Sequence, residues 1–180
     1  MKSFWTQIND SRPDQEKLPT LSQGDWLPDC LIPIFKPDFG RGEQPADVPV
    51  SEADLIIVTQ TCDLVNKKVS LVALCPIHAL ESFENKNPKF RQKGKWEEVR
   101  KGRIEGLHLL ASPTDPDNNR KALVVDFGQI ISLPFEHLTE KAQNLGDRWR
   151  LGSPFLEHFS QAFARFFMRV GLPPSIPPFK

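Results

Sequence analysis

The chain has 180 residues, enough for one domain that buries roughly 70% of its unfolded surface without a disulfide or metal to hold it together. Lysine plus arginine and aspartate plus glutamate number 23 each, so the chain as a whole does not attract nucleic acid or an anionic membrane; such binding would need a local patch. Three cysteines, no apolar leader and no apolar run of transmembrane length predict a cytoplasmic protein with reduced thiols.

The first part of the chain has weak patterns. Residues 1–23 are polar and are predicted to be irregular. Gln23-Gly24-Asp25 is typical of a turn into a first strand, and residues 30–35 are predicted to be short and extended. Residues 36–53 are rich in proline, glycine and acid, which predicts a surface loop.

A β-hairpin is the clearest β signal. Residues 55–62 and 69–76 have strand patterns, and the polar segment 65–68 connects them. Both faces are mostly apolar, which predicts central strands of a sheet. The first strand runs into a polar cluster, residues 59–63, whose side chains can hydrogen-bond or attack an electrophile beside the core.

The second half begins with a basic insertion, residues 84–105. Eight lysines and arginines lie between residues 86 and 103 against two glutamates, a local net charge of +6. Strands are expected next at 106–111, 122–127 and 129–133, with Gly128 as a turn or bulge, and a short helix at 134–145.

The C-terminal helix, residues 153–172, has the strongest signal. Ser153 is expected to cap it, Pro154 to occupy its first position and Gly171 to end it. Apolar residues recur at helical spacing and predict a buried stripe, while polar residues follow at four-residue steps on the opposite face. The stripe is Phe155, Phe159, Ala162, Phe163, Phe166, Phe167 and Val170, and the polar face is Glu157, Gln161, Arg165 and Arg169.

These elements predict an α+β fold. We expect a small, mostly antiparallel SH3-like β-barrel over residues 24–152, with 84–105 as an insertion and the long amphipathic helix 153–172 packed on the barrel.

The chain resembles a family of uncharacterised bacterial proteins. The motifs that carry this resemblance are Gln23-Gly24-Asp25, residues 58–64 (VTQTCDL), 124–127 (VVDF) with 132–134 (SLP), and 150–158 (RLGSPFLEH) continuing to 169–173 (RVGLP). They span about 150 residues. The resemblance implies that these residues form one unit, and it assigns no activity.

The strand order is also similar to the PemK/MazF-like SH3-type barrels of bacterial toxins. An early Gly-Asp opens the first strand, a later strand ends in Pro76, and the last strands precede a helix. This resemblance implies a ribonuclease in a defence or toxin-like system. The Arg-Pro that these toxins carry before the second strand is replaced here by Ala53-Asp54.

The polar cluster offers two kinds of site, each with an alternative. Cys62 with Asp63 and His158 could form a nucleophilic site, or Cys62 could be a buried structural thiol whose neighbouring carboxylate opposes thiolate formation. A ligand could bind at the end of the strand and along the helix, or the same groups could form a buried polar network. The ligand-binding candidates are Thr59, Gln60, Thr61, Gln161 and Arg169.

The basic insertion suits phosphate contacts and base stacking, and its alternative is a solvated, mobile loop. The nucleic-acid-binding candidates are Lys89, Arg91, Lys93, Lys95, Trp96, Arg100, Lys101 and Arg103. Cys75 and His78 have the spacing of half a zinc site, but no second tight pair accompanies them, so no metal or cofactor is expected.

Three functions follow in order of preference. The first is a non-enzymatic interaction or regulatory module with a protein partner. The second is a toxin-like ribonuclease or an RNA-binding protein that uses residues 86–103. The third is a Cys62-dependent hydrolase or transferase. No membrane association is expected.

Overall fold

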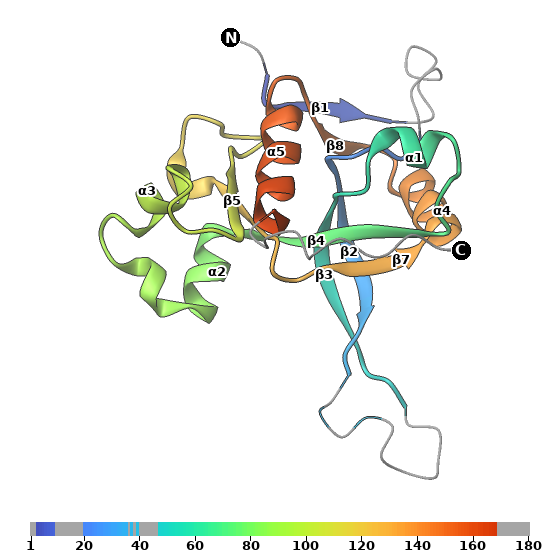
Figure 1. The fold of residues 1–180 in the computed structure, drawn as a ribbon, viewed down its shortest axis with the longest axis horizontal. Helices are drawn as coiled ribbons and strands as arrows, with labels where there is room; N and C mark the ends of the chain where they lie inside the picture. Colours follow the sequence, from blue (N-terminus) through green and yellow to red (C-terminus); the bar gives the residue numbers. More distant parts are fainter. Residues whose placement is uncertain (1–2, 10–19, 36, 38, 40–46, 169–180) are drawn as a thin grey trace, which may run out of the picture.

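The computed structural model describes residues 3–9, 20–35, 37, 39 and 47–168, and it is built on one antiparallel sheet (Figure 1). The predicted α+β class and mostly antiparallel sheet are confirmed. The strands follow the order β1 (Trp5–Ile8), β8 (Arg148–Leu151), β2 (Asp25–Pro33), β3 (Val50–Ile57), β4 (Leu71–Ala79), β6 (Leu123–Asp126) and β5 (Leu107–Leu110), and β7 (Ile131–Pro134) pairs with β4.

The sheet is not a closed barrel. In the described part of the chain β1 and β5 are the two ends of the hydrogen-bonded order, so the predicted closure is wrong. The indole Nε1 of Trp5 donates to the carbonyl oxygen of Ala111 at 2.7 Å, just beyond β5. Helix α3 (Lys95–Arg100) packs beside β5.

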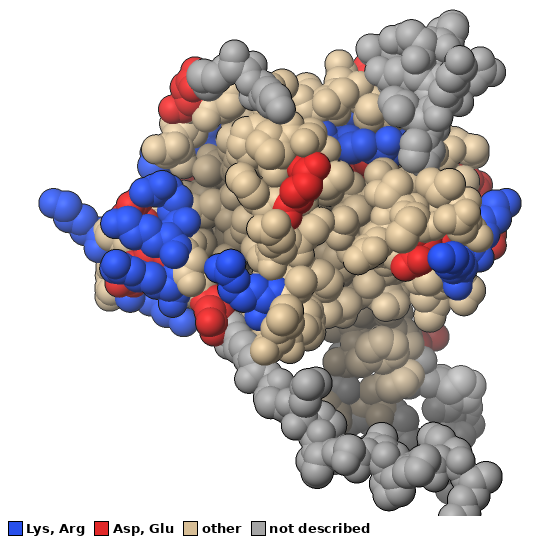
Figure 2. Space-filling model, turned by 45° about the horizontal axis from the view of Figure 1, so that its top comes forward, with Lys and Arg blue, Asp and Glu red and all other residues tan. Residues whose placement is uncertain are grey.

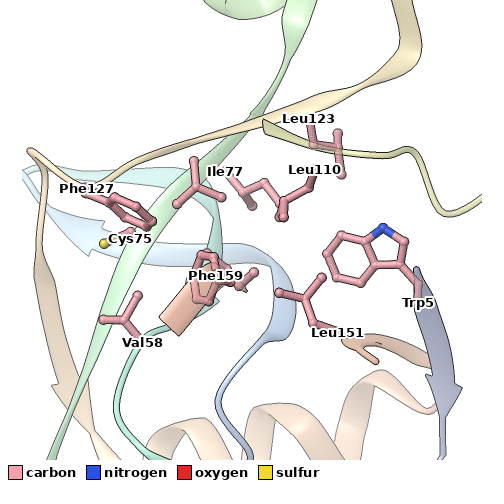
Figure 3. Packing of buried hydrophobic residues seen from close by; sticks show 11 residues of the cluster. Trp5, Val58, Cys75, Ile77, Leu110, Leu123, Phe127, Leu151 and Phe159 are labelled. Carbon is pink, nitrogen blue, oxygen red and sulfur yellow. The ribbon is translucent and has the colours of Figure 1, made fainter. Parts of the chain in front are cut away.

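Side chains along the central strands point alternately to the two faces of the sheet, and a hydrophobic core lies on each face. Leu55 and Ile57 of β3 point into one cluster, whereas Ile56 and Val58 point into the other, as the two-residue period of a strand requires. Helix α5 (Phe155–Phe167) covers the cluster of Ile56, with Phe159 fully buried in it (Figure 3). Helix α4 (Phe135–Leu145) covers the other cluster through Leu138 and Ala142.

The central hairpin is confirmed, but its connection is helical. β3 and β4 pair with Ile56 opposite Cys75. Between them lies a short helix, α1 (Thr61–Val65), whose Leu64 is buried. The amides of Asp63 and Leu64 donate to the carbonyl of Gln60, so the chain turns into a helix where an extended strand was expected.

Two strands were not expected from the sequence. They are β1, which lies in the N-terminal segment that was predicted to be irregular, and β8. In addition, β3 begins at Val50, within the predicted surface loop. β8 pairs with both β1 and β2. Its sequence, Arg-Trp-Arg-Leu, is too charged to indicate a buried strand.

The basic insertion is folded. It begins within α2 (Leu80–Lys86) and contains a 3₁₀ turn η1 (Pro88–Arg91) and α3, and η2 (Asn119–Lys121) lies on the loop after β5. Phe83, Phe90 and Val99 bury their side chains against Val124 of β6 and form a third small core. The mobile-loop alternative is therefore wrong, because these aromatic groups have a sheet to pack on.

The C-terminal helix begins slightly later than expected. Pro154 occupies the N-cap position, so Ser153 precedes the cap and makes no side-chain cap hydrogen bond. Phe159 is buried, Phe155, Phe163 and Phe166 are half-buried, and Phe167 is half exposed. Residues 169–172 of the predicted helix lie outside the described residues. No helix in the described chain is long and apolar enough to cross a membrane.

Candidate functional site

Two of the sequence motifs, Gln23-Gly24-Asp25 and residues 150–158, meet at one buried carboxylate, Asp25. Arg150 donates to it from Nε and, at 2.8 Å, from Nη2, and Nε of Arg148 lies 3.4 Å from Oδ2. The amide of Ser22 also donates to Oδ2 at 3.1 Å. Asp25 and the Arg148 side chain are fully buried. Burial raises the pKa of the Asp25 carboxyl, and the two guanidinium groups act in the opposite direction.

A second set of polar contacts extends from Gln23. Its side-chain amide donates to the carbonyl of Val58 at 2.9 Å, and the hydroxyl of Ser160 on α5 donates to its Oε1 at 2.8 Å. The hydroxyl of Thr61 accepts from the backbone N–H of Gln23 at 3.1 Å and lies 2.7 Å from the hydroxyl of Ser22. We call the residues 22, 23, 25, 61, 148, 150 and 160 the polar hub.

Gly24 allows β2, β8 and α5 to approach one another closely at the polar hub. Its φ is +84°, and a Cβ placed on it would lie 2.9 Å from Cβ of Leu151 and 3.0 Å from Leu156 of α5. Its amide donates to Ile57 and its carbonyl accepts from Leu151, so one residue ties β3 to β8. Only glycine combines this conformation with this close approach.

The predicted ligand-binding residues separate in space. Thr59 and Thr61 use their hydroxyls inside the protein, because Thr59 accepts from the amide of Ala73 at 2.8 Å and Thr61 belongs to the polar hub. Gln60 and Gln161 are exposed, on different elements. Arg169 lies outside the described residues. The geometry favours the polar-network alternative for the two threonines.

The predicted nucleophile is exposed, and its hydrogen-bond partners in the described chain are Gln60 and Asp63. Sγ of Cys62 lies 3.6 Å from Oε1 of Gln60 and 3.8 Å from Oδ1 of Asp63, and Asp63 lies 3.8 Å from the ammonium of Lys68. No histidine is a hydrogen-bond partner of Cys62 in the described chain. The predicted general base, His158, is exposed on α5, where it interacts electrostatically with His108.

The predicted nucleic-acid-binding residues gather at the α3 end of the molecule, where basic and acidic side chains mix (Figure 2). Glu97 binds both Arg100, at 2.6 Å, and Lys101, at 3.2 Å, and Glu98 binds Lys95 at 3.0 Å. Lys89 lies over the ring of Phe90, Arg91 bonds to Asn85, and Lys93 and Arg103 are exposed. Internal ion pairs thus offset much of the local positive charge.

Trp96 is also occupied within the fold. Its ring packs at 5.1 Å from Phe90 and 5.8 Å from Phe83, and its Nε1 donates to Glu84 at 2.7 Å. Glu84 accepts a bidentate pair from Arg120 at 2.9 and 3.0 Å. These donors lower the pKa of Glu84 to about 2. Trp96 therefore anchors the insertion and is not a free platform for a stacked base.

The sequence did not reveal the ion cluster of Asp25, Arg148 and Arg150. A signal was present, because two arginines two residues apart share one face of a strand. Without the pairing of β8 with β2, nothing showed that this face was buried.

These observations define the class of protein only as an α+β fold with an open antiparallel sheet and a buried polar hub. In the described chain, no three metal-binding side chains cluster together. Comparison with protein-family models, curated proteins and solved structures gave no match to the chain.

Proposed function

We propose that the protein is a non-enzymatic interaction module, built on an SH3-like arrangement of strands, that binds a protein partner through a projecting arm. The arm is the outer half of the β2–β3 hairpin, residues 30–35 and 49–53, and it extends away from the body (Figure 1). There the two strands pair with each other, from Cys30 opposite Ala53 to Pro33 opposite Val50.

The observation that carries the proposal is the apolar surface of this arm. Ten large hydrophobic side chains are exposed in the described chain, and five of them lie on the arm or directly beyond it: Leu31, Ile34, Phe35, Phe39 and Val50. Isolated exposed apolar residues are ordinary on a protein surface, whereas a concentration on one projecting element is typical of a contact surface.

The backbone of the arm supports a specific kind of partner. β2 pairs with β8 only at Asp25 and Trp26, and β3 pairs with β4 only from Leu55 to Ile57, so both outer edges of the arm lack a described neighbour strand. An exposed apolar edge of this kind invites strand addition. We expect an extended, apolar segment of a partner protein to pair with the arm.

The interior of the fold supports a binding role over catalysis. The polar groups of the hub are used to join β2, β8, α1 and α5, and no histidine bonds to Cys62 within the described chain. Because the threonine hydroxyls at the end of β3 bond within the protein, they are not available to a ligand. The exposed apolar arm is then the feature that best supports a binding role.

The test compares two matched sets of substitutions. Leu31→Ser with Val50→Ser changes the arm, and Val65→Ser with Leu71→Ser changes two side chains of similar exposure elsewhere: 53% and 61% against 56% and 55%. We expect the wild type and the control variant, Val65→Ser with Leu71→Ser, to bind the partner protein stoichiometrically in a pull-down assay. The arm variant, Leu31→Ser with Val50→Ser, should not bind it. Both variants should keep the wild-type melting temperature, because exposed substitutions change stability little.

Equal capture by the two variants would contradict the assignment to the arm. A concentration-dependent dimer in light scattering, abolished by Leu31→Ser with Val50→Ser, would identify a second copy as the partner. Activity of the wild type as a hydrolase, lost in Cys62→Ala, would overturn the non-enzymatic assignment.

A further inference from the structure

A pocket of about 240 Å³ lies between the end of α3, the loop that leads to β5, and α5. Arg100 and Lys101 line it from α3, and Arg165 lines it from α5. The pocket therefore joins part of the basic insertion to the polar face of the C-terminal helix, two regions more than sixty residues apart in the sequence. It does not include the arm, so an inference about it is independent of the proposed partner contact.

The charges around this pocket favour an anion. Arg100 and Lys101 share a single carboxylate, Glu97, which leaves one of their two positive charges uncompensated. Arg165 is exposed and has no ion pair in the described chain. Glu105 also lines the pocket and opposes an anion. Three cations against these two carboxylates give a net positive site, and arginines are suited to phosphate because their donors form a planar fork.

The inner wall of the pocket is aromatic, with two rings whose planes are tilted by 44°. Phe127 and Phe166 both line it, with ring centroids 6.3 Å apart. Gly106 lets the ring of Phe166 approach the loop, because a Cβ at this position would lie 3.1 Å from Cε2 of that ring. Aromatic faces bind the planar rings of nucleobases without selecting one base.

His108 adds a polar group to this wall. Its ring lies 5.9 Å from Phe127 and 5.7 Å from Phe159, and its nitrogens have no hydrogen-bond partner in the described chain. Burial, together with the nearby His158, lowers the pKa of His108 to about 4, so the imidazole is neutral at physiological pH. A neutral imidazole offers one donor and one acceptor to the edge of a bound ring.

We propose that this pocket binds a nucleoside monophosphate, with its phosphate at Arg100, Lys101 and Arg165 and its base on the Phe127–Phe166 wall beside His108. The volume of the pocket favours a small ligand. Pockets for drug-sized ligands span about 300–1,000 Å³, so a pocket of about 240 Å³ accepts one base and leaves the phosphate at the open, basic rim.

Calorimetric titration of the full chain tests the proposal with AMP, GMP, CMP and UMP as probes, beside inorganic phosphate and adenosine. We expect at least one nucleotide to bind with a Kd below about 1 mM and at least tenfold more tightly than either fragment. Arg165→Ala and Phe166→Leu should each weaken that nucleotide at least tenfold. Arg91→Ala, which changes an exposed arginine of the basic insertion outside the pocket, should leave its Kd within twofold.

Three results would overturn the proposal. The first is no binding of any of the four nucleotides. The second is equal weakening by Arg165→Ala and Arg91→Ala, which would mean diffuse charge attraction. The third is a single-stranded RNA oligonucleotide that binds tightly, is not displaced by the nucleotides and is lost in Arg91→Ala, which would move recognition to an extended surface. Circular dichroism of each variant confirms that it is folded, and partner capture by Arg165→Ala tests the arm separately.

Discussion

Arg150 and Asp25 form a two-point ion pair inside the protein, between strands that are neighbours in the sheet although 125 positions apart in the chain. Arg148, two residues earlier on the same strand face, bonds to the same carboxylate. One acidic group therefore bonds to two buried guanidinium groups and fixes β8 against β2.

Replacing Asp25 by Asn should be strongly destabilising. The change removes the negative charge that both buried arginines contact, and we expect a loss of about 3–5 kcal/mol in the free energy of unfolding. Asp117→Asn, at an exposed position, should change it by less than about 0.5 kcal/mol. Urea denaturation of both variants measures the difference, and similar midpoints would show that the cluster does not stabilise the fold.

Gly24→Ala and Gly94→Ala form a matched pair for the packing at the hub. Both glycines have φ close to +85°, but a Cβ at Gly94 meets no atom within 4 Å, whereas one at Gly24 meets Leu151 at 2.9 Å. Backbone strain should cost each variant about 1–2 kcal/mol, and Gly24→Ala should lose at least a further ~1 kcal/mol from overpacking. Thermal unfolding compares the two, and equal losses would contradict the steric argument.

Trp5 should contribute to stability through its indole donor. Trp5→Phe removes the hydrogen bond to Ala111, while Trp26→Phe removes an Nε1 that is buried with no partner in the described chain. Both lose similar volume, so we expect Trp5→Phe to be less stable than Trp26→Phe by about 1 kcal/mol. Equal stability in chemical denaturation would show that the bond does not hold the open edges of the sheet together.

His108 should make stability fall in mild acid. Its pKa is about 4 in the folded protein against 6.5 as its ordinary value, so between these pH values the unfolded chain binds a proton that the folded protein does not. Its contribution is fully present above pH 6.5 and is lost as the pH falls toward 4, by about 3 kcal/mol at most.

The corresponding experiment measures unfolding free energy from pH 7 to pH 4. His108→Gln should lose less stability over this range than the wild type, whereas His137→Gln, at an exposed position of α4, should follow the wild-type curve. A His108→Gln curve parallel to that of the wild type would contradict this source of acid sensitivity.

The three cysteines should differ in reactivity. Cys62 is exposed, whereas burial raises the pKa of the Cys30 thiol to about 11 and that of the Cys75 thiol to about 12. Mass spectrometry after thiol labelling at pH 8 should find one modified cysteine in the native protein and three after denaturation. Labelling of Cys30 or Cys75 without denaturant would mean that a core opens readily.

Much of the fold could be predicted because its signals are local. The alternation in β3 and β4, the apolar stripe of α5 and the glycine turn at Gly24 each depend on residues close together in the chain. β1 and β8 were missed because polar or charged residues make up half of each of these four-residue strands. In such a short segment, partners elsewhere in the chain decide whether it becomes a strand.

The candidate site could be predicted in its parts and not in its arrangement. The sequence alone identified Gln23-Gly24-Asp25, the polar cluster at 59–63 and the motif that begins at Arg150 as distinctive, but it favoured an extended strand at Cys62. A five-residue helix in a hairpin connection is stabilised mainly by its buried Leu64, a contact that periodicity does not reveal.

The sequence by itself determined the α+β class, the central hairpin and the amphipathic C-terminal helix, because hydrophobic periods of two and about 3.6 residues are local properties of the chain. Only the tertiary structure decided that the sheet stays open, that two arginines of β8 are buried against Asp25, and that α3 and α5 share a pocket. These features depend on contacts between residues 60 to 125 positions apart. The free energy of such contacts depends on how the strands and helices pack against one another, which local sequence patterns do not specify.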